Sequence, residues 1–378
     1  MVRWLVNSIR SCGKYPKEYI YLQKCNLVNI KLKWAKDMVL DEAVAGKRDL
    51  KVASILVSVI SSSSETSVPI YRLRRHRGQL GLPDELKLST FLRRYPTIFH
   101  ESSFLDSAGT PVPAFSLTPE ASNLRNEELN IFKQNETDLV NRVRKLLMLV
   151  KHTTLPSQTI DQLRWDLGLP YDYHQTLIPH FPEHFSSVKL EDDRVGLKLL
   201  SWDDQLAVSH FQKNAALSEN REAFRIGFTR GFGLRRKCTE WLEEWQKLPY
   251  TSPYSDASHL DPRTDVSEKR IVGVFHELLH LTIYKQTERK NVSNLRKPLG
   301  LPQKFTKVFE RHPGIFYLSM KSDTQTVVLR EAFQRSELIE KHPLVEIRRK
   351  YAELMEKGFL DRSRGLYRKT RDAKEQCV

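Results

Sequence analysis

The sharpest chemical motif in the sequence is His276-Glu277-Leu278-Leu279-His280. Two histidines four residues apart lie on one face of a helix, where they can hold a zinc ion while the glutamate activates a water molecule. Such a site also needs a third protein ligand. Residues 281–290 contain no histidine, and Glu288 lies on what we expect to be the same helix. A zinc metallopeptidase is therefore the less favoured interpretation.

The helix around this motif is expected to bury its opposite side. At about 100° per residue, the two histidines lie about 140° and 180° from Ile271, the first residue of an apolar stripe. We expect the pair on a polar face, solvated or hydrogen-bonded, with no bound metal. The stripe consists of Ile271, Val274, Phe275, Leu278 and Thr282.

Other catalytic patterns are missing from the sequence, which has no G-x-S-x-G, no P-loop and no G-x-G-x-x-G. The histidines at 174, 180 and 184 are separated by Pro179 and Pro182, which indicate a helix end and a strand start rather than a ligand geometry. We therefore predict a protein that is not an enzyme, with no catalytic residue and no cofactor.

Basic side chains point instead to a polyanionic partner. The formal net charge is +15, and residues 1–100 hold 18 Lys or Arg against 8 Asp or Glu. Arginine binds phosphate and stacks on bases, and Trp and Tyr stack on unpaired bases. Trp34 has a second interpretation as a core anchor beside Leu32. The candidate RNA-binding residues are Lys33, Trp34, Lys36, Arg72, Arg74, Arg75, Arg77, Arg93, Arg94, Tyr95, Arg235, Arg236 and Lys237.

The N-terminal segment, residues 1–28, resembles an organellar presequence. Four basic residues and several apolar ones precede the first acidic residue, Glu18. This composition favours a mitochondrion, with a chloroplast as the alternative, although a frayed basic N-terminus has a similar composition. The longest nearly apolar run, Val52–Ile60, is far shorter than the roughly 20 residues that cross a bilayer, so we predict no membrane-spanning segment.

An internal repeat organises the chain. Leu-Gly-Leu-Pro occurs at residues 80–83, 167–170 and 299–302, and each copy is followed by a Pro-x-x-Phe segment. Glycine there suits the left-handed position after a helix, and proline suits the first turn of the next helix. We expect the second helices at 84–94, 171–179 and 303–311.

Two short strand-like runs around a polar turn follow each Pro-x-x-Phe segment and predict three β-hairpins. The expected fold is α+β and predominantly helical, with three tandem helix-turn-helix plus β-hairpin modules that are winged-helix-like and joined by helices. Connecting helices are expected at 37–47, 50–61, 120–151 and 203–225. The predicted segments are 1–28 (presequence), 29–118 (first module with N-terminal helices), 119–205 (second module), 206–265 (helical connector with Trp and Pro), 266–345 (third module) and 346–378 (helical end and basic tail).

Several blocks in a fixed order resemble the plant organelle RNA recognition (PORR) domain family. The resemblance covers about residues 29–354. The blocks are Leu32-Lys33-Trp34-Ala35-Lys36-Asp37, the first Leu-Gly-Leu-Pro, Arg93-Arg94-Tyr95-Pro96-Thr97-Ile98-Phe99, Leu248-Pro249-Tyr250, Ser252-Pro253-Tyr254, His276-Glu277-Leu278-Leu279 and His312-Pro313-Gly314-Ile315-Phe316-Tyr317-Leu318-Ser319.

The resemblance implies an organellar protein that binds single-stranded or structured RNA and promotes group II intron splicing. Such a protein stabilises the intron fold and has no active site of its own. The expected partners are intron-containing organellar RNA and other splicing factors in a ribonucleoprotein, with no membrane. A DNA-binding or protein-bridging scaffold is the alternative function. The resemblance carries over no individual RNA-contacting residue and no particular intron.

Overall fold

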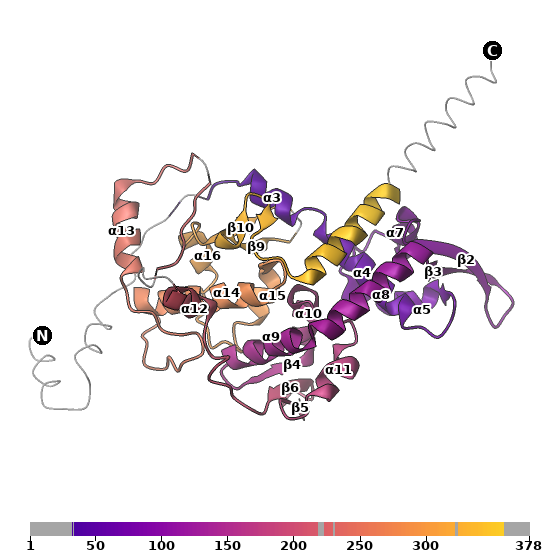
Figure 1. Cartoon of the computed structure of the whole chain (residues 1–378), viewed down its shortest axis with the longest axis horizontal. Coiled ribbons are helices and arrows are strands. Elements are labelled where there is room, and N and C mark those ends of the chain that lie inside the picture. The colour runs from indigo at the N-terminus through magenta and orange to yellow at the C-terminus, as the bar shows by residue number, and fades with distance from the viewer. Residues whose placement is uncertain (1–31, 33, 218–222, 230, 322–323, 359–378) are drawn as a thin grey trace, which may run out of the picture. The chain divides into compact units, whose positions relative to one another are not determined.

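A computed structural model describes residues 32, 34–217, 223–229, 231–321 and 324–358, and it combines helices with small antiparallel sheets (Figure 1). The predicted α+β class is confirmed. The predicted presequence and the tail after residue 358 lie outside the described residues. In the described part of the chain, no helix combines the length and apolar character needed to cross a membrane.

The chain forms two compact units. Unit 1 contains Met1–Leu40, Arg144–Thr159 and Glu183–Arg335, and unit 2 contains Asp41–Val143, Ile160–Pro182 and Ser336–Val378. The chain passes from one unit to the other five times, within α3 (Met38–Val44), α9 (Glu136–Leu149) and α10 (Ser157–Leu167), and after residues 182 and 335.

Unit 2 is built from long and short helices and one three-stranded sheet. In chain order it contains α4 (Lys47–Ser61), β1 (Val68–Pro69), α5 (Ile70–Arg74), α6 (Arg77–Leu80), α7 (Leu88–Arg94), β2 (Phe99–Leu105), β3 (Pro111–Leu117), α8 (Pro119–Gln134), α11 (Tyr173–Thr176), η1 (Ile178–His180), β11 (Glu337–Leu338) and a helix over residues 343–358.

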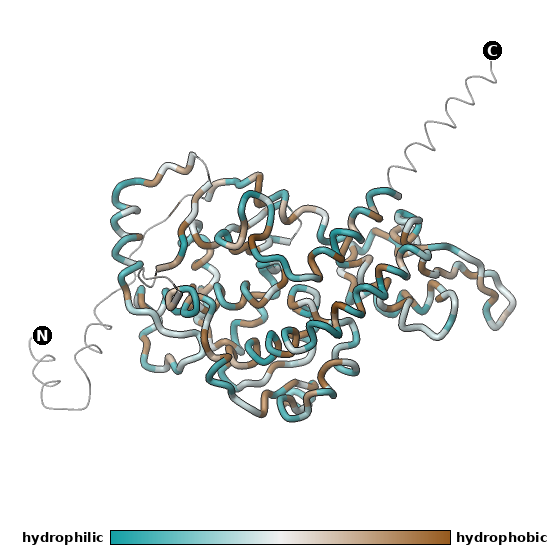
Figure 2. Tube along the Cα trace, viewed as in Figure 1, coloured by the Kyte–Doolittle hydropathy of each residue, from teal (hydrophilic) through white to brown (hydrophobic). Residues whose placement is uncertain are grey.

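The core of unit 2 forms around α4, whose apolar run from Val52 to Ile60 is buried. Two serines interrupt this run, and the hydroxyls of Ser54 and Ser58 donate to the backbone carbonyls four residues earlier at 2.9 Å, so neither is buried without a partner. The helix over 343–358 contributes Ile347, Tyr351 and Met355. Figure 2 shows this helix as mostly hydrophilic, with short separate apolar patches, as expected when only one face is buried.

Unit 1 contains the other two three-stranded sheets and the long, mostly buried helix α14. Its elements are β4 (Thr154–Pro156), β5 (Phe185–Lys189), β6 (Val195–Leu199), α12 (His210–Leu217), α13 (Arg236–Gln246), α14 (Asp265–Leu281), β7 (Gln286–Glu288), α15 (Arg289–Asn294), α16 (Lys307–Arg311), β8 (Phe316–Ser319), β9 (Thr326–Leu329), η2 (Arg330–Ala332) and β10 (Phe333–Gln334).

The three three-stranded sheets share one strand order: β1-β3-β2, β4-β6-β5 and β7-β9-β8, all antiparallel. The predicted hairpins β2–β3, β5–β6 and β8–β9 are therefore confirmed. Each sheet also has a strand of two or three residues that precedes its helices, which we did not predict. The Phe of each Pro-x-x-Phe segment is buried at the first pair of its hairpin, as Phe99 opposite Leu117, Phe185 opposite Leu199 and Phe316 opposite Leu329.

The glycine of each Leu-Gly-Leu-Pro copy has the left-handed backbone conformation that the sequence predicts. Gly81, Gly168 and Gly300 have φ values of 65°, 78° and 64°. The amide of Leu169 donates to Arg164 O at 2.9 Å, and that of Leu301 donates to Arg296 O at the same distance, which is the bond of a Schellman cap. Gly300, however, ends a series of turns rather than an assigned helix.

Several expected helices differ in length. The second helices of the repeat are shorter than predicted and form as α7, α11 and α16, because the residues just after each Leu-Gly-Leu-Pro form turns. The segment 120–151 is two helices, separated at Asn135, whose side chain donates to Ile131 O at 2.8 Å. The helix expected at 203–225 is wrong at 203–209 and 223–225, and residues 218–222 lie outside the described residues. Only α12 forms among its described residues, and Asp203 holds a turn ahead of it by accepting from the amides of 205 and 206.

Candidate nucleic-acid interface

In unit 1, Trp34 lies against the hairpin strand β8. Its indole Nε1 donates to Leu318 O at 3.0 Å, and its ring is stacked on Tyr317 with centroids 6.4 Å apart and planes at 14°. The side chain is nevertheless 42% exposed. The hydrogen bond and the contact with Tyr317 hold Trp34 in place, as the core-anchor interpretation requires. Its exposed surface remains accessible, as base stacking requires.

A buried ion pair holds the segment that carries Trp34. Asp37 Oδ2 accepts from Arg330 Nη1 at 2.7 Å and from Thr229 Oγ1 at 3.0 Å, while the Asp37 amide donates to the Tyr317 hydroxyl at 3.1 Å. Burial alone would raise the pKa of Asp37, but the hydrogen bond and charge of Arg330 outweigh it, so the pKa lies below its ordinary value. The Leu-Lys-Trp-Ala-Lys-Asp block thus fastens its own chain segment to the third hairpin.

Trp34 also lines a pocket of about 300 Å³ in unit 1. Phe228 and Phe232, stacked at 4.8 Å, contribute to its aromatic wall together with Tyr317. Arg289 lines it as well, and its guanidinium donates to Gln325 Oε1 at 2.5 Å. Glu310 also lines the pocket, and its Oε1 lies 3.6 Å from Arg289 Nη2, so the charge of Arg289 is partly balanced there. The aromatic wall suits stacking of a planar ligand.

The other candidate residues of unit 1 lie on the surface. Lys36 is exposed, and Lys33 lies outside the described residues. Arg235 and Lys237 are exposed at the start of α13, and Arg236 forms an exposed ion pair with Glu240 at 2.9 Å.

In unit 2, the arginine run falls on and after α5. Arg72, Arg74 and Arg75 are exposed, and Arg72 pairs with Glu65 at 2.9 Å. Arg77 differs, because its guanidinium donates to the carbonyls of Leu86, Pro83 and Asp84 at 2.9 to 3.0 Å and so braces the turn after Gly81. These bonds assign Arg77 to the turn rather than to the phosphate-binding surface that we expected for it.

Of the candidates near the end of α7, only Tyr95 is buried. Tyr95 is only 5% exposed, and its hydroxyl donates to Asp49 Oδ2 at 2.6 Å, so its ring cannot stack on a base as predicted. Arg94 lies 3.6 Å from the same carboxylate. Arg93 is exposed but donates to Glu101 Oε2 at 2.8 Å, which raises the pKa of the guanidinium and joins α7 to β2.

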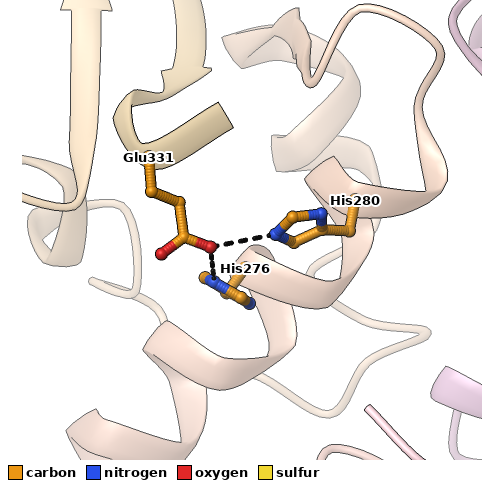
Figure 3. Close-up of side chains that lie close together, drawn as sticks. All are labelled: His276, His280 and Glu331. Atoms are coloured by element: carbon orange, nitrogen blue, oxygen red, sulfur yellow. Dashed lines mark hydrogen bonds and ion pairs between the residues drawn. The ribbon is translucent and has the colours of Figure 1, made fainter. Parts of the chain in front are cut away.

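The His-Glu-x-x-His segment lies on α14, but its polar face is not solvated. His276 is 2% exposed, and both histidines are hydrogen-bonded to Glu331 of η2 (Figure 3). Of the two expected alternatives, solvated or hydrogen-bonded, the structure shows the hydrogen-bonded one, and the partner is a carboxylate. Glu331 lies 51 residues after His280, outside the segment in which a ligand was sought.

Glu277 points into a different network. Its Oε1 lies 2.6 Å from Lys145 Nζ and accepts from the Tyr254 hydroxyl at 2.7 Å, and its Oε2 accepts from the His210 amide at 2.6 Å. Burial would raise the pKa of Glu277, but Lys145 and these hydrogen bonds lower it below its ordinary value. Both oxygens are thus engaged, which leaves Glu277 poorly placed to activate a water molecule.

Sequence reasoning missed four residues of these sites: Phe228, Phe232, Arg289 and Glu331. The two phenylalanines lie in a loop without helical or strand periodicity, so their pattern did not distinguish lining a pocket from core packing. Arg289 and Glu331 are single charged residues outside any run. Only the pairing of β9 with β7 and β8 and the adjoining turns bring them into place.

Comparisons with known proteins agree with the resemblance seen in the sequence. Residues 35–360 match the model of the plant organelle RNA recognition domain. The chain is 38% identical over 346 residues to "Protein WHAT'S THIS FACTOR 9, mitochondrial" of Arabidopsis thaliana, covering 89% of this chain and 88% of that protein.

Two further relatives show the same similarity at lower identity. "Protein WHAT'S THIS FACTOR 1 homolog, chloroplastic" of Oryza sativa subsp. japonica is 31% identical, over 86% of this chain and 65% of that protein. "Protein ROOT PRIMORDIUM DEFECTIVE 1" of Arabidopsis thaliana is 28% identical, over 79% of this chain and 76% of that protein. No solved structure matches. With a family match over most of its length, the chain belongs to the plant organelle RNA recognition domain family.

Proposed function

We propose that this protein binds organellar RNA and promotes group II intron splicing by holding intron segments in a fold-competent arrangement, without catalysis of its own. Family membership supports RNA as the ligand. The observation that carries the proposal in the structure is Trp34, an anchored but 42% exposed indole beside an aromatic pocket that Arg289 also lines. A base can stack on the free indole surface, while the exposed Lys36, two residues further along the chain, attracts the phosphate backbone.

A second contact surface is proposed in unit 2, formed by Arg72, Arg74 and Arg75. These exposed guanidinium groups attract phosphate without reading sequence, so their part is affinity and positioning. Lys36 and the exposed Arg235, Arg236 and Lys237 serve the same purpose in unit 1. Selectivity among RNA segments would then come from stacking of unpaired bases and from RNA shape.

The tandem architecture belongs to this proposal. The shared strand order of the three sheets supports three winged-helix-like modules within 29–118, 119–205 and 266–345. In the first module, the β2–β3 hairpin projects from its helices (Figure 1), and the Arg93–Glu101 pair links that hairpin to α7. A helix and a hairpin linked in this way can contact nucleic acid together, as the wing and second helix of such a module do.

We place the protein in mitochondria, with chloroplasts as the alternative. A relative that matches 89% of this chain is named mitochondrial, and other relatives are named chloroplastic. Its partners would be intron-containing transcripts and other splicing factors of the same ribonucleoprotein.

Two experiments test this function. Crosslinking and sequencing of RNA bound to the protein in isolated mitochondria and chloroplasts should recover group II introns from one organelle. In competition binding, single-stranded or structured intron RNA should displace a labelled RNA better than duplex DNA does. Preference for duplex DNA, or no intron recovered from either organelle, would reject the proposal in favour of a DNA-binding or bridging scaffold.

The arginine surface is tested by the triple variant R72Q/R74Q/R75Q against R349Q/K350Q/K357Q, which removes the same charge from exposed or half-exposed positions of the helix over 343–358. Each lost phosphate contact on a single strand should lower the slope of log K against log salt by about 0.7. The first variant should therefore lose affinity and slope, and the control should lose much less. Equal losses would mean that only net charge matters.

A further inference from the structure

The buried cluster of His276, His280 and Glu331 in unit 1 has the composition and arrangement of a metal site (Figure 3). Glu331 Oε1 lies 2.6 Å from His276 Nε2 and 3.1 Å from His280 Nε2. The three ligand atoms all lie within 4.8 Å of one another. Two imidazole nitrogens and a carboxylate oxygen therefore converge on one point, and imidazole with carboxylate is a ligand set that zinc accepts.

Two separate elements create this convergence. Histidines four residues apart on α14 project from one face of the helix, one turn above the other. Glu331 comes from η2, which directly follows strand β9, and β9 packs against α14. The ligands are thus placed by a helix and by a sheet edge rather than by one flexible loop.

The separations of Glu331 from the two histidines are close to those around a four-coordinate zinc ion. Zinc–ligand bonds of about 2.0–2.1 Å at tetrahedral angles place neighbouring ligand atoms about 3.3 Å apart. The His280 separation already matches this value, and the His276 separation must open by about 0.7 Å. His280 and Glu331 are each 10% exposed, so an ion has a path to the site.

The surroundings favour a structural ion over a hydrolytic one. Glu277, which would have to activate water in a metallopeptidase, is engaged by Lys145, Tyr254 and the His210 amide. The His210 ring stacks on His280 with centroids 3.5 Å apart and covers one side of the site.

We infer that His276, His280 and Glu331 bind one zinc-class divalent ion, which fastens η2, and with it the end of the third hairpin, to α14. Three protein ligands leave one coordination position for water. Such an ion would stabilise η2, whose first residue is Arg330, the partner of Asp37, and would so support the segment that carries Trp34. The inference is independent of which RNA the protein binds.

The test begins with elemental analysis of the full chain, loaded with zinc and dialysed against metal-free buffer. Wild type should retain about one zinc per chain, and Glu331→Gln and His280→Gln should retain less than a tenth of that. His152→Gln, which removes one exposed imidazole of unit 1, should bind as wild type does. Zinc retained equally by all four proteins, or by none, would overturn the inference.

Two measurements on the wild-type chain keep the test valid if the variants fail to fold. Cobalt added in place of zinc should give the intense visible absorption of four-coordinate cobalt, and zinc should abolish it. The melting temperature should rise with the logarithm of free zinc and fall on chelation, because the ion binds the folded state. Weak six-coordinate absorption, or a melting temperature that ignores zinc, would contradict the site. Zinc-dependent cleavage of an unfolded protein that is lost in Glu277→Gln would overturn the structural assignment.

Discussion

Replacing Trp34 separates a stacking role in RNA binding from a packing role in stability. The indole is 42% exposed, and an aromatic side chain buries roughly 150–250 Å² when fully buried, so its remaining packing is worth about 2–4 kcal/mol at about 25 cal/mol per Å². The bond from Nε1 to Leu318 O adds about 1 kcal/mol. Trp34→Ala should therefore destabilise unit 1 measurably, and Trp34→Phe should lose chiefly the hydrogen bond.

The effect on RNA binding is expected to follow a different rule. Loss of one base stack costs roughly 1–3 kcal/mol, which is about a 5- to 150-fold increase in Kd. Trp34→Ala should show this loss, Trp34→Phe should retain most of the affinity, and the salt slope should change little because no phosphate contact is removed. The assay is fluorescence anisotropy with a labelled single-stranded RNA over a salt series, corrected for the folded fraction by circular dichroism.

Trp202 supplies the matched control in the same unit. It is 47% exposed, its Nε1 donates to Asp204 Oδ1 at 3.0 Å, and among the described residues it is not part of the pocket wall. Trp202→Ala should leave RNA affinity near that of wild type. If Trp34→Ala loses no more affinity than Trp202→Ala once both are corrected for folding, then Trp34 only packs and the proposed stacking site is refuted.

Two further predictions concern ion pairs. Asp37→Asn should destabilise unit 1 by about 3 kcal/mol in urea unfolding, because it leaves the buried Arg330 charge without its partner, and a loss below about 1 kcal/mol would contradict that reasoning. In unit 2, burial would raise the pKa of Asp138, but His342 and Arg142 lower it to about 2, so its contribution is complete above its ordinary pKa and is lost as pH falls toward 2. The stability difference between wild type and Asp138→Asn should therefore shrink from pH 5 to pH 3, and a constant difference would exclude this origin.

The repeat could be predicted because its signals are local. Gly81 and the matching glycines take a backbone angle that other residues avoid, and the Phe three residues after each second proline begins a strand. The short strands β1, β4 and β7 could not be found in this way, since two or three residues show no alternation. Their positions depend on the hairpins that they join. The shortened second helices have the same origin, because tertiary contacts such as the bonds of Arg77 stabilise turns where propensity allows a helix.

The arginine and aromatic candidates show how charge runs mislead at the level of single residues. A dense run correctly predicted exposed guanidinium groups at Arg72, Arg74 and Arg75. The same run includes Arg77, which braces a turn, and the nearby Tyr95 is buried on Asp49. Composition cannot separate these outcomes, because a side chain is assigned to a carbonyl or a carboxylate only when the fold brings that acceptor close.

Helical periodicity could not predict the surroundings of the His-Glu-x-x-His segment, because these too depend on which residues the fold brings close. Periodicity finds the face of α14 that must be apolar, but it cannot say whether the other face meets water or another element. Here that face meets Glu331 on one side and the partners of Glu277 on the other, and both come from distant parts of the sequence. Buried polar groups must find partners, so a polar face that is covered by the fold becomes either a hydrogen-bonded network or a ligand site. Glu277 illustrates the first outcome, and zinc retention by Glu331→Gln decides whether the two histidines represent the second.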